Sequence, residues 1–147
     1  MFGEKLRTSI LLQRLFQTSS IDRFIRRYND DMETVPPFHE FISDLCNERN
    51  IPPERIIKKA DIARTYGHQI FSGMRKPTRD RAIQLAFGFE MTYEEAQELL
   101  KVARKSTLYP RIKRDAIIIY ALKNGYDIVT VQSALFDLSL PILGEER

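Results

Sequence analysis

The stretch of sequence that decides the fold runs from Ile51 to Thr78 and reads IPPERIIKKADIARTYGHQIFSGMRKPT. Its apolar residues recur at helical spacing in two short blocks, which predict one helix over residues 54–60 and a second helix from Ala63 to Ser72. Asp61 lies in the tight turn between the two helices. Gly73 ends the second helix, because glycine readily adopts the left-handed conformation that closes a helix.

Helical spacing continues on both sides of this stretch, and no convincing run of alternating strand residues interrupts it. The predicted fold class is therefore all-α. Towards the N-terminus we expect a helix over residues 5–16, a second helix that begins after Ser20, a linker over residues 29–37, and a helix that runs from about Pro37 to Asn50.

Towards the C-terminus, several side chains mark helix starts, because their oxygens can accept hydrogen bonds from free backbone N–H groups. Residues 111–123 form a further helix that is apolar nearly all round, so we expect it to be buried on more than one side. Thr78 is predicted to start a helix that ends at Gly88. Thr92 and Glu95 form a predicted capping box for a helix over residues 93–105. Asp127 is predicted to start the last helix.

Five consecutive short helices with these spacings resemble the helix-turn-helix domain of the phage-repressor family, also called the xenobiotic response element (XRE) family. Residues 51–78 align with that family without a gap. The segment YPRIKRDAIIIYALKNG, residues 109–125, also looks like an extension found on some small bacterial repressor-like proteins. The apolar, glycine and proline positions of the family fall on Ile56, Ala60, Ile62, Ile70, Gly73 and Pro77.

This resemblance implies an architecture in three parts. A helical extension occupies residues 1–35, and the five-helix repressor-like helix-turn-helix core occupies residues 36–106. A helical pair over residues 107–147 packs on that core. The extra apolar helices before residue 29 and after Pro110 either complete one common core or form an interface with a second copy or another partner.

Basic residues are concentrated in two blocks of the chain. Nine basic and three acidic residues lie between Arg49 and Arg81, and six basic and no acidic residues lie between Lys101 and Arg114. Such a block attracts a phosphate backbone, because each cation that neutralises a phosphate releases condensed counterions. Either block taken alone is equally well explained as a solvated surface.

The resemblance implies a transcriptional regulator that binds double-stranded DNA as a homodimer, with the helix from Ala63 to Ser72 in the major groove. By position, Arg64, Thr65 and Gln69 would face the bases, with His68 nearby. Arginine can donate two hydrogen bonds to guanine, and glutamine can pair with adenine. The phosphate backbone would be contacted by Arg75, Lys76, Lys58, Lys59 and Arg79.

Four positions depart from the family's pattern. Asp61 replaces a glycine in the tight turn, but aspartate tolerates a left-handed conformation. Gly67 replaces a buried aliphatic residue, so we expect a gap that Tyr66 fills. Pro53 replaces a polar residue that anchors the start of the domain's second helix, over residues 54–60, on a phosphate, and proline has no backbone donor. Phe71 replaces an exposed polar residue, so it should pack on the N-terminal extension or form a sticky patch.

Gly67, Pro53 and Phe71 favour a second hypothesis, a protein-interaction adaptor in bacterial signalling or phage defence. Such an adaptor keeps the fold but binds a protein partner through its N-terminal helices or through the surface around Phe71. The cations at Arg64, Arg75 and Lys76, together with Gln69, favour the DNA-binding regulator. The regulator is the main hypothesis, and the adaptor is the alternative.

The residues that carry catalysis in other proteins are sparse in this sequence. His39 and His68 have no partner at metal-ligand spacing, and Cys46 has no nearby base, so we expect neither an enzyme nor a bound cofactor or metal. Cys46 lies in an apolar stretch and is predicted to be a core residue of a cytoplasmic protein. No apolar run approaches the roughly 20 residues that cross a membrane.

Overall fold

In the computed structural model, the described residues 6–145 form helices, turns and irregular segments, with no strand. The all-α prediction is therefore confirmed for this part of the chain. The chain divides between Val35 and Pro36 into two compact units. Each unit is described separately below.

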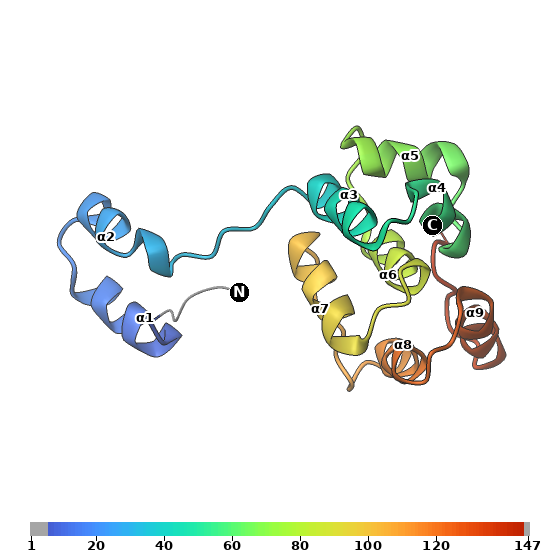
Figure 1. Ribbon diagram of the computed structural model, residues 1–147. Helices are drawn as coiled ribbons and strands as arrows, with labels where there is room; N and C mark the ends of the chain where they lie inside the picture. The colour runs from blue at the N-terminus through green and yellow to red at the C-terminus, as the bar shows by residue number, and fades with distance from the viewer. Residues whose placement is uncertain (1–5, 146–147) are drawn as a thin grey trace. The chain divides into compact units, whose positions relative to one another are not determined.

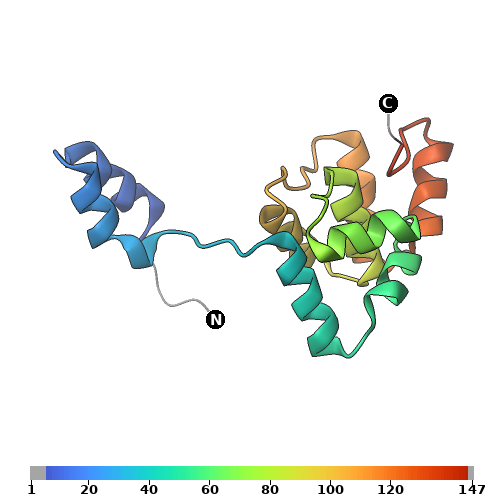
Figure 2. The same ribbon diagram turned by 90° about the horizontal axis from the view of Figure 1, so that it is seen from above.

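The described part of the first unit, residues 6–35, contains two α-helices and one short 3-10 turn (Figures 1 and 2). They are α1, Thr8–Gln17, α2, Ile21–Arg27, and η1, Asn29–Asp31. The first helix begins three residues later than predicted, and Lys5 lies outside the described residues. Ser20 caps α2 as predicted, because its side-chain oxygen accepts a hydrogen bond from the backbone N–H of Arg23.

The interior of the first unit is small. Among residues 6–35, the buried aromatic residues are Phe24 and Tyr28, one turn apart on and just after α2, and their ring centres lie 4.8 Å apart. Arg14 of α1 donates a hydrogen bond of 3.2 Å to the Tyr28 hydroxyl. The backbone N–H of Leu6 donates to the Asp31 carboxylate at 2.9 Å, which links the start of the described chain to η1.

The second unit contains seven helices between residues 38 and 137, close to the predicted positions. The helix predicted over residues 93–105 ends earlier than expected, at Val102, because Arg104 adopts a positive φ of 58°. The helices are α3, Phe38–Arg49, α4, Pro53–Lys59, α5, Arg64–Ser72, α6, Arg79–Gly88, α7, Tyr93–Val102, α8, Lys113–Lys123, and α9, Ile128–Asp137.

The predicted helix caps are confirmed. The Thr78 and Asp127 side chains accept hydrogen bonds at the starts of α6 and α9, and Thr92 and Glu95 form the capping box of α7. Gly73 ends α5 in the left-handed conformation, with a φ of 84°. These caps satisfy backbone groups that would otherwise lack partners at the helix ends.

Helix α6 is the central element of the second unit (Figure 1). Every residue from Ala82 to Gly88 is buried, and α6 contacts α4, α7 and α9. Gly88 allows α4 to approach closely, because a Cβ atom at this position would lie only 2.7 Å from the Ile56 carbonyl oxygen. The remaining helices of the unit pack around this buried helix, so α6 fixes the helices on both sides of it.

Two ion pairs of opposite polarity join the first turn of α6 to the first turn of α8. Arg79 donates two hydrogen bonds to Asp115, at 3.0 and 2.8 Å, and Arg114 donates two to Asp80, both at 2.9 Å. Paired hydrogen bonds between a guanidinium and a carboxylate fix geometry as well as charge. We call these four residues the double clamp, and they set how α8 lies on α6.

The double clamp also holds the segment that follows α9. Arg114 donates to the backbone carbonyls of Pro141 and Ile142, and the backbone N–H of Gly144 donates to Asp80. The amide of Gln132 is hydrogen bonded to both the N–H and the carbonyl of Leu143. Residues 141–144 are therefore held by side-chain contacts to helices α6, α8 and α9 without forming a helix themselves.

Helix α8 is less enclosed than its apolar sequence predicts. Ile118, Ala121 and Leu122 are buried, as the prediction requires, but Tyr120 is 59% exposed. The Tyr120 ring packs edge-on against Tyr126, with a centre-to-centre distance of 5.9 Å. One side of α8 therefore faces solvent, and aromatic contacts cover part of it.

Acid should weaken the second unit through Asp80. Burial raises the pKa of this carboxyl, but the hydrogen bonds from Arg114 and Gly144 and the charges of Arg114 and Arg79 outweigh burial and lower its pKa below the ordinary value of 3.8. A lowered folded-state pKa gives stability that is complete above the ordinary pKa and is lost as the pH falls through the lowered value.

We therefore expect Asp80→Asn to lower the melting temperature at pH 7 and to reduce the loss of stability between pH 5 and pH 2. Circular dichroism melts at several pH values measure both effects. The matched control is Asp137→Asn, which changes an exposed aspartate with no ion pair in the described chain. An equal acid sensitivity in the Asp80 variant and the wild type would contradict the assignment.

Candidate nucleic-acid interface

Helix α5 has one buried side and one polar, exposed side. Gly67, Ile70 and Phe71 are buried, whereas Arg64, Thr65, His68 and Ser72 are exposed and Gln69 is half-buried. Residues three or four positions apart lie on one side of a helix, so Arg64, Thr65, His68 and Ser72 share the outer side. We call these four residues the α5 outer face. It carries no carboxylate, because α5 contains no Asp or Glu.

Gly67 does not leave the gap that the sequence predicts. A Cβ atom at Gly67 would lie 2.4 Å from the Cγ2 atom of Ile57, so the Ile57 side chain already fills this space. Tyr66, which was expected to fill it, is half-buried instead. The glycine therefore has a packing role, since it lets α4 lie directly against α5.

Phe71 does not form an exposed patch either. It is only 7% exposed and belongs to the main hydrophobic core of the second unit, where α3 packs on α5. The predicted partner surface around Phe71 is therefore wrong. The physical reason is helix α3, which packs on α5 and contributes buried apolar residues to the same core as Phe71.

The turn between α4 and α5 depends on a left-handed aspartate and a buried glutamine. Asp61 has a φ of 56°, which confirms that it takes the conformation usually left to glycine. Gln84 of α6 is 1% exposed, and its amide nitrogen donates to the carbonyls of Ala60 and Asp61 at 3.1 and 3.3 Å. Sequence reasoning missed Gln84, although a glutamine inside the apolar stretch RAIQLAFGF was a signal.

Arg64 lies at the start of α5, beside the start of α4. Its guanidinium forms an ion pair with Glu54, and both side chains are largely exposed, at 77% and 58%. An exposed ion pair contributes little to stability, on the order of 0–1 kcal/mol. A phosphate or a base edge could therefore replace Glu54 as the partner of Arg64 at low cost.

Arg75 contacts two residues of α5, Gln69 through a hydrogen bond and Tyr66 through its ring. The Arg75 side chain donates a 3.1 Å hydrogen bond to the Gln69 side-chain oxygen, and its guanidinium lies 4.8 Å from the centre of the Tyr66 ring. Arg81 lies 5.0 Å from the same ring centre. Sequence reasoning did not place Tyr66 between two arginines, since Arg75 and Arg81 follow it at non-helical spacing.

Among the basic residues from Arg49 to Arg81, four already have carboxylate partners. These are Arg49 with Glu95, Lys59 with Glu90, Arg64 with Glu54, and Arg79 with Asp115. Four others form no ion pair in the described part of the chain, namely Arg55, Lys58, Arg75 and Lys76. Arg75 and Lys76 are exposed in the loop after α5, next to the α5 outer face in sequence.

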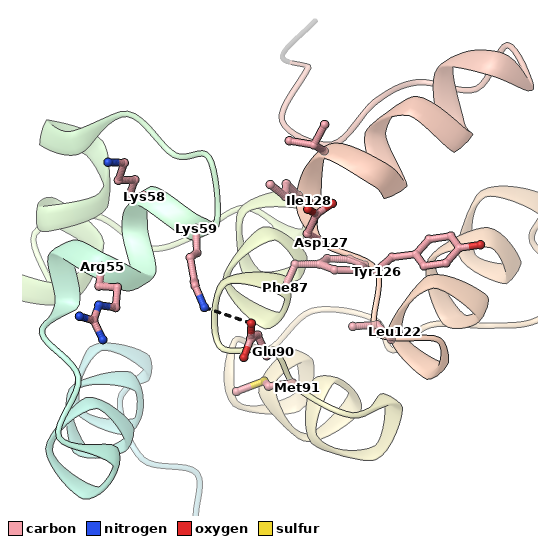
Figure 3. Close-up of a pocket in the computed structure, with 12 residues that line it drawn as sticks. Arg55, Lys58, Lys59, Phe87, Glu90, Met91, Leu122, Tyr126, Asp127 and Ile128 are labelled. Carbon is pink, nitrogen blue, oxygen red and sulfur yellow. Dashed lines mark hydrogen bonds and ion pairs between the residues drawn. The ribbon is translucent and has the colours of Figure 1, made fainter.

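Lys58 and Lys59 border a separate hollow of about 890 Å³ between α4, the end of α6 and the turn before α9. Figure 3 shows Lys59 directed towards Glu90, with an ion-pair distance of 3.0 Å. Apolar side chains line much of the hollow, among them Phe87, Met91, Leu122 and Ile128, and Arg55 and Asp127 also border it. Phosphate contacts by Lys58 and Lys59 stay a prediction, and Lys59 must leave Glu90 to make one.

The predicted phosphate contact by Arg79 is wrong. Its guanidinium makes four hydrogen bonds within the protein, two to Asp115 and one each to the carbonyls of Ser106 and Thr107. Asp115 is 1% exposed, so its charge needs this partner inside the fold. The sequence could not show this, because Asp115 lies 36 residues away along the chain.

The other predictions concern single residues or absences. Cys46 is buried in the core as predicted, and burial raises the pKa of its thiol, with a smaller opposing effect from the charge of Arg49. Among the described residues, no three His, Cys, Asp or Glu side chains are arranged to hold a metal ion. No helix over residues 6–145 has the length and apolar character needed to span a bilayer.

Adding a methyl group at Gly67 should destabilise the second unit, although alanine favours helix. The gain in helix propensity is about 1 kcal/mol, but overpacking against Ile57 costs about 1–3 kcal/mol. We expect Gly67→Ala to lower the free energy of unfolding by up to about 2 kcal/mol in urea titrations. In the Ile57→Ala background, the same change should be neutral or stabilising. A loss of equal size in both backgrounds would contradict the contact.

Removing the Arg79 side chain should lower the free energy of unfolding, because this residue holds the fold and not a surface contact. Arg79→Ala leaves Asp115 buried without its counter-charge, and breaking such a pair costs about 3–5 kcal/mol. Urea titration followed by circular dichroism measures this loss. The matched control Lys76→Ala removes one exposed cation and should change stability by less than about 0.5 kcal/mol. Equal, small effects of both substitutions would show that the double clamp is unimportant.

Comparisons with models of known protein families, with curated proteins and with solved structures found no match to this chain. The function is therefore proposed from the side chains themselves. The group best placed for binding consists of the α5 outer face, Gln69, and the two loop cations Arg75 and Lys76.

Proposed function

We propose that this protein is a non-enzymatic, DNA-binding transcriptional regulator with a repressor-like helix-turn-helix, whose helix α5 enters the major groove. The observation that carries the proposal is the α5 outer face, which is exposed, polar and free of carboxylates, and is followed directly by two exposed cations. A surface of this kind suits an anionic duplex, because no fixed negative charge on α5 opposes its approach.

The residues of α5 have distinct roles in this proposal. Arg64 and Gln69 read base edges, and Thr65 and His68 lie where they can make further base or phosphate contacts. Gln69 is well suited to this task, because a hydrogen bond from Arg75, which itself lies over the Tyr66 ring, orients its side chain before any DNA arrives. Such preorganisation reduces the entropy lost on binding.

The phosphate backbone is contacted by Arg75 and Lys76 in the loop after α5. Neither side chain forms an ion pair in the described chain, so their charges are available to an external anion. Each cation that meets a phosphate adds to the dependence of affinity on salt concentration. Lys58 is a further candidate for such a contact, while Arg79 is excluded by its place in the double clamp.

The adaptor hypothesis loses most of its support. Gly67 and Phe71, which favoured a protein-binding role, are explained by packing against Ile57 and by burial in the core. Pro53 begins α4 at a position where its missing N–H group has no helical partner to lose. These residues therefore fit the fold equally well with either function and no longer distinguish the two.

Fluorescence anisotropy tests the proposal. The full chain is titrated into labelled duplex from upstream of its own gene and into a scrambled duplex, each at two salt concentrations. We expect tighter binding to the first duplex and a marked loss at higher salt. Arg64→Ala and Gln69→Ala should each weaken specific binding by about 1–3 kcal/mol, which is roughly 5- to 150-fold.

Two further variants separate base contacts from simple charge. Lys76→Ala should weaken binding to both duplexes equally and lower the salt slope by about 1. The control Lys123→Ala removes the same charge from the exposed end of α8 and should leave binding unchanged. Absence of binding to either duplex at micromolar protein and low salt would overturn the proposal. Equal binding to both duplexes would reduce it to a non-specific interaction.

A further inference from the structure

A polar hollow of about 550 Å³ lies in the first unit, between α1 and α2 and beside the turn that joins them. Three arginines border it, and its other described walls are uncharged side chains, among them hydroxyl groups of the turn and the buried rings of Phe24 and Tyr28. The arginines are Arg14 of α1 and Arg23 and Arg27 of α2. We call this site the arginine hollow.

Charge is unevenly distributed around the arginine hollow. Residues 6–35 carry five arginines and four carboxylates. Three of these arginines border the hollow, whereas none of these four carboxylates does. The carboxylates are Asp22, Asp30, Asp31 and Glu33, and the two remaining arginines are Arg7 and Arg26. This part of the chain is therefore nearly neutral as a whole, but its one hollow between the helices is strongly positive.

The three arginines of the hollow have no carboxylate partner within residues 6–145. The ion pairs of that part of the chain all join residues of the second unit. Like charges that are gathered in one place repel each other, and an anion between them replaces that repulsion by attraction. The arginine hollow therefore favours an anion from outside the chain.

Two of the arginines are positioned by the same buried ring. Tyr28 is only 8% exposed, and the guanidinium carbons of Arg14 and Arg27 each lie 5.6 Å from the centre of its ring. Arg14 also donates a hydrogen bond of 3.2 Å to the Tyr28 hydroxyl. The ring thus attracts one cation from each helix. Part of the entropy that flexible arginines lose on binding is lost before a ligand arrives.

The chemistry of the hollow suits a phosphate group. A guanidinium can donate two parallel hydrogen bonds to phosphate oxygens, and such charge-assisted bonds are stronger than neutral ones. Gln17 and Ser19 also border the hollow and form no side-chain hydrogen bond within residues 6–145, so they can donate to further oxygens.

The size of the hollow indicates a small ligand. Sites for small molecules have volumes of about 300–1,000 Å³, and the arginine hollow lies within that range. Its three cations also surround one space instead of following a line along the surface, as contacts to the backbone of a nucleic acid would. A small molecule that carries a phosphate group fits both observations.

We propose that the arginine hollow is a binding site for a small phosphorylated molecule, whose phosphate oxygens accept hydrogen bonds from Arg14, Arg23 and Arg27. The proposal rests on the first unit alone and holds whether or not α5 binds DNA. A ligand that binds only the folded state adds to its stability, so occupancy of the hollow also strengthens the small first unit.

Isothermal titration calorimetry of the full chain with inorganic pyrophosphate, without DNA and at constant ionic strength, tests the site. We expect saturable binding that weakens at least about tenfold in each of Arg14→Gln, Arg23→Gln and Arg27→Gln, because each variant loses hydrogen bonds to a charged group. Arg23→Gln is the most informative variant, since the Arg23 side chain has no hydrogen bond or ring contact within residues 6–145 whose loss would disturb the fold.

The matched controls are Arg7→Gln and Arg26→Gln. Each removes one exposed arginine from the same unit, outside the hollow. Affinity for pyrophosphate should change by less than about twofold in both, because salt screens a charge that makes no direct contact with the ligand. Circular dichroism at matched concentration shows whether each variant keeps its helices.

Absence of heat from the wild type at millimolar pyrophosphate would overturn the proposal. Equal losses of affinity in Arg23→Gln and Arg26→Gln would also overturn it, since binding would then reflect the general charge of the unit. A third contrary outcome concerns nucleic acid. If Arg23→Gln weakens binding of a labelled duplex while pyrophosphate does not bind at all, the arginines contact a nucleic-acid backbone and not a small molecule.

Discussion

The second unit depends on the neutralisation of one carboxylate that is almost completely withdrawn from water. Asp115 at the start of α8 is 1% exposed, and the Arg79 guanidinium at the start of α6 supplies its counter-charge. A buried charge is tolerated only when it is paired and hydrogen bonded. Because Arg114 and Asp80 repeat the pairing with the signs reversed, two neighbouring turns are fixed in register by four hydrogen bonds. The clamp therefore makes the C-terminal helices part of the same core as α3 to α7.

The buried helix α6 supports the candidate interface. Gln84 of α6 holds the turn before α5, and Gly88 lets α4 pack against α6 at close range. Helix α5 in turn lies against Ile57 of α4 through the bare backbone of Gly67. The polar outer face of α5 thus stands on two layers of tightly packed helix. Side chains supported in this way keep their geometry better than side chains on loops. Such rigidity suits the proposed contact with the regularly spaced groups of a DNA duplex.

Much of the fold could be predicted from local signals, but the pairing of charges could not. Thr78, Thr92 and Asp127 act within three residues of their own position, so the sequence shows these caps directly. Arg79 looked like a surface cation because its partner is distant in the chain, and whether a given arginine faces water depends on such long-range contacts. Phe71 and Gly67 were misjudged for a related reason. Their surroundings are supplied by α3 and by Ile57, and no local pattern reports them.

The contact between Gly67 and Ile57 also constrains the order in which substitutions at these two positions can accumulate during evolution. A side chain at position 67 lowers stability while position 57 is isoleucine, because the two would occupy the same space. A smaller residue at position 57 first opens a cavity and lowers stability. Any lineage that crosses between the two states passes through this less stable intermediate. We therefore expect positions 57 and 67 to covary among homologues, with glycine at 67 retained wherever 57 is β-branched.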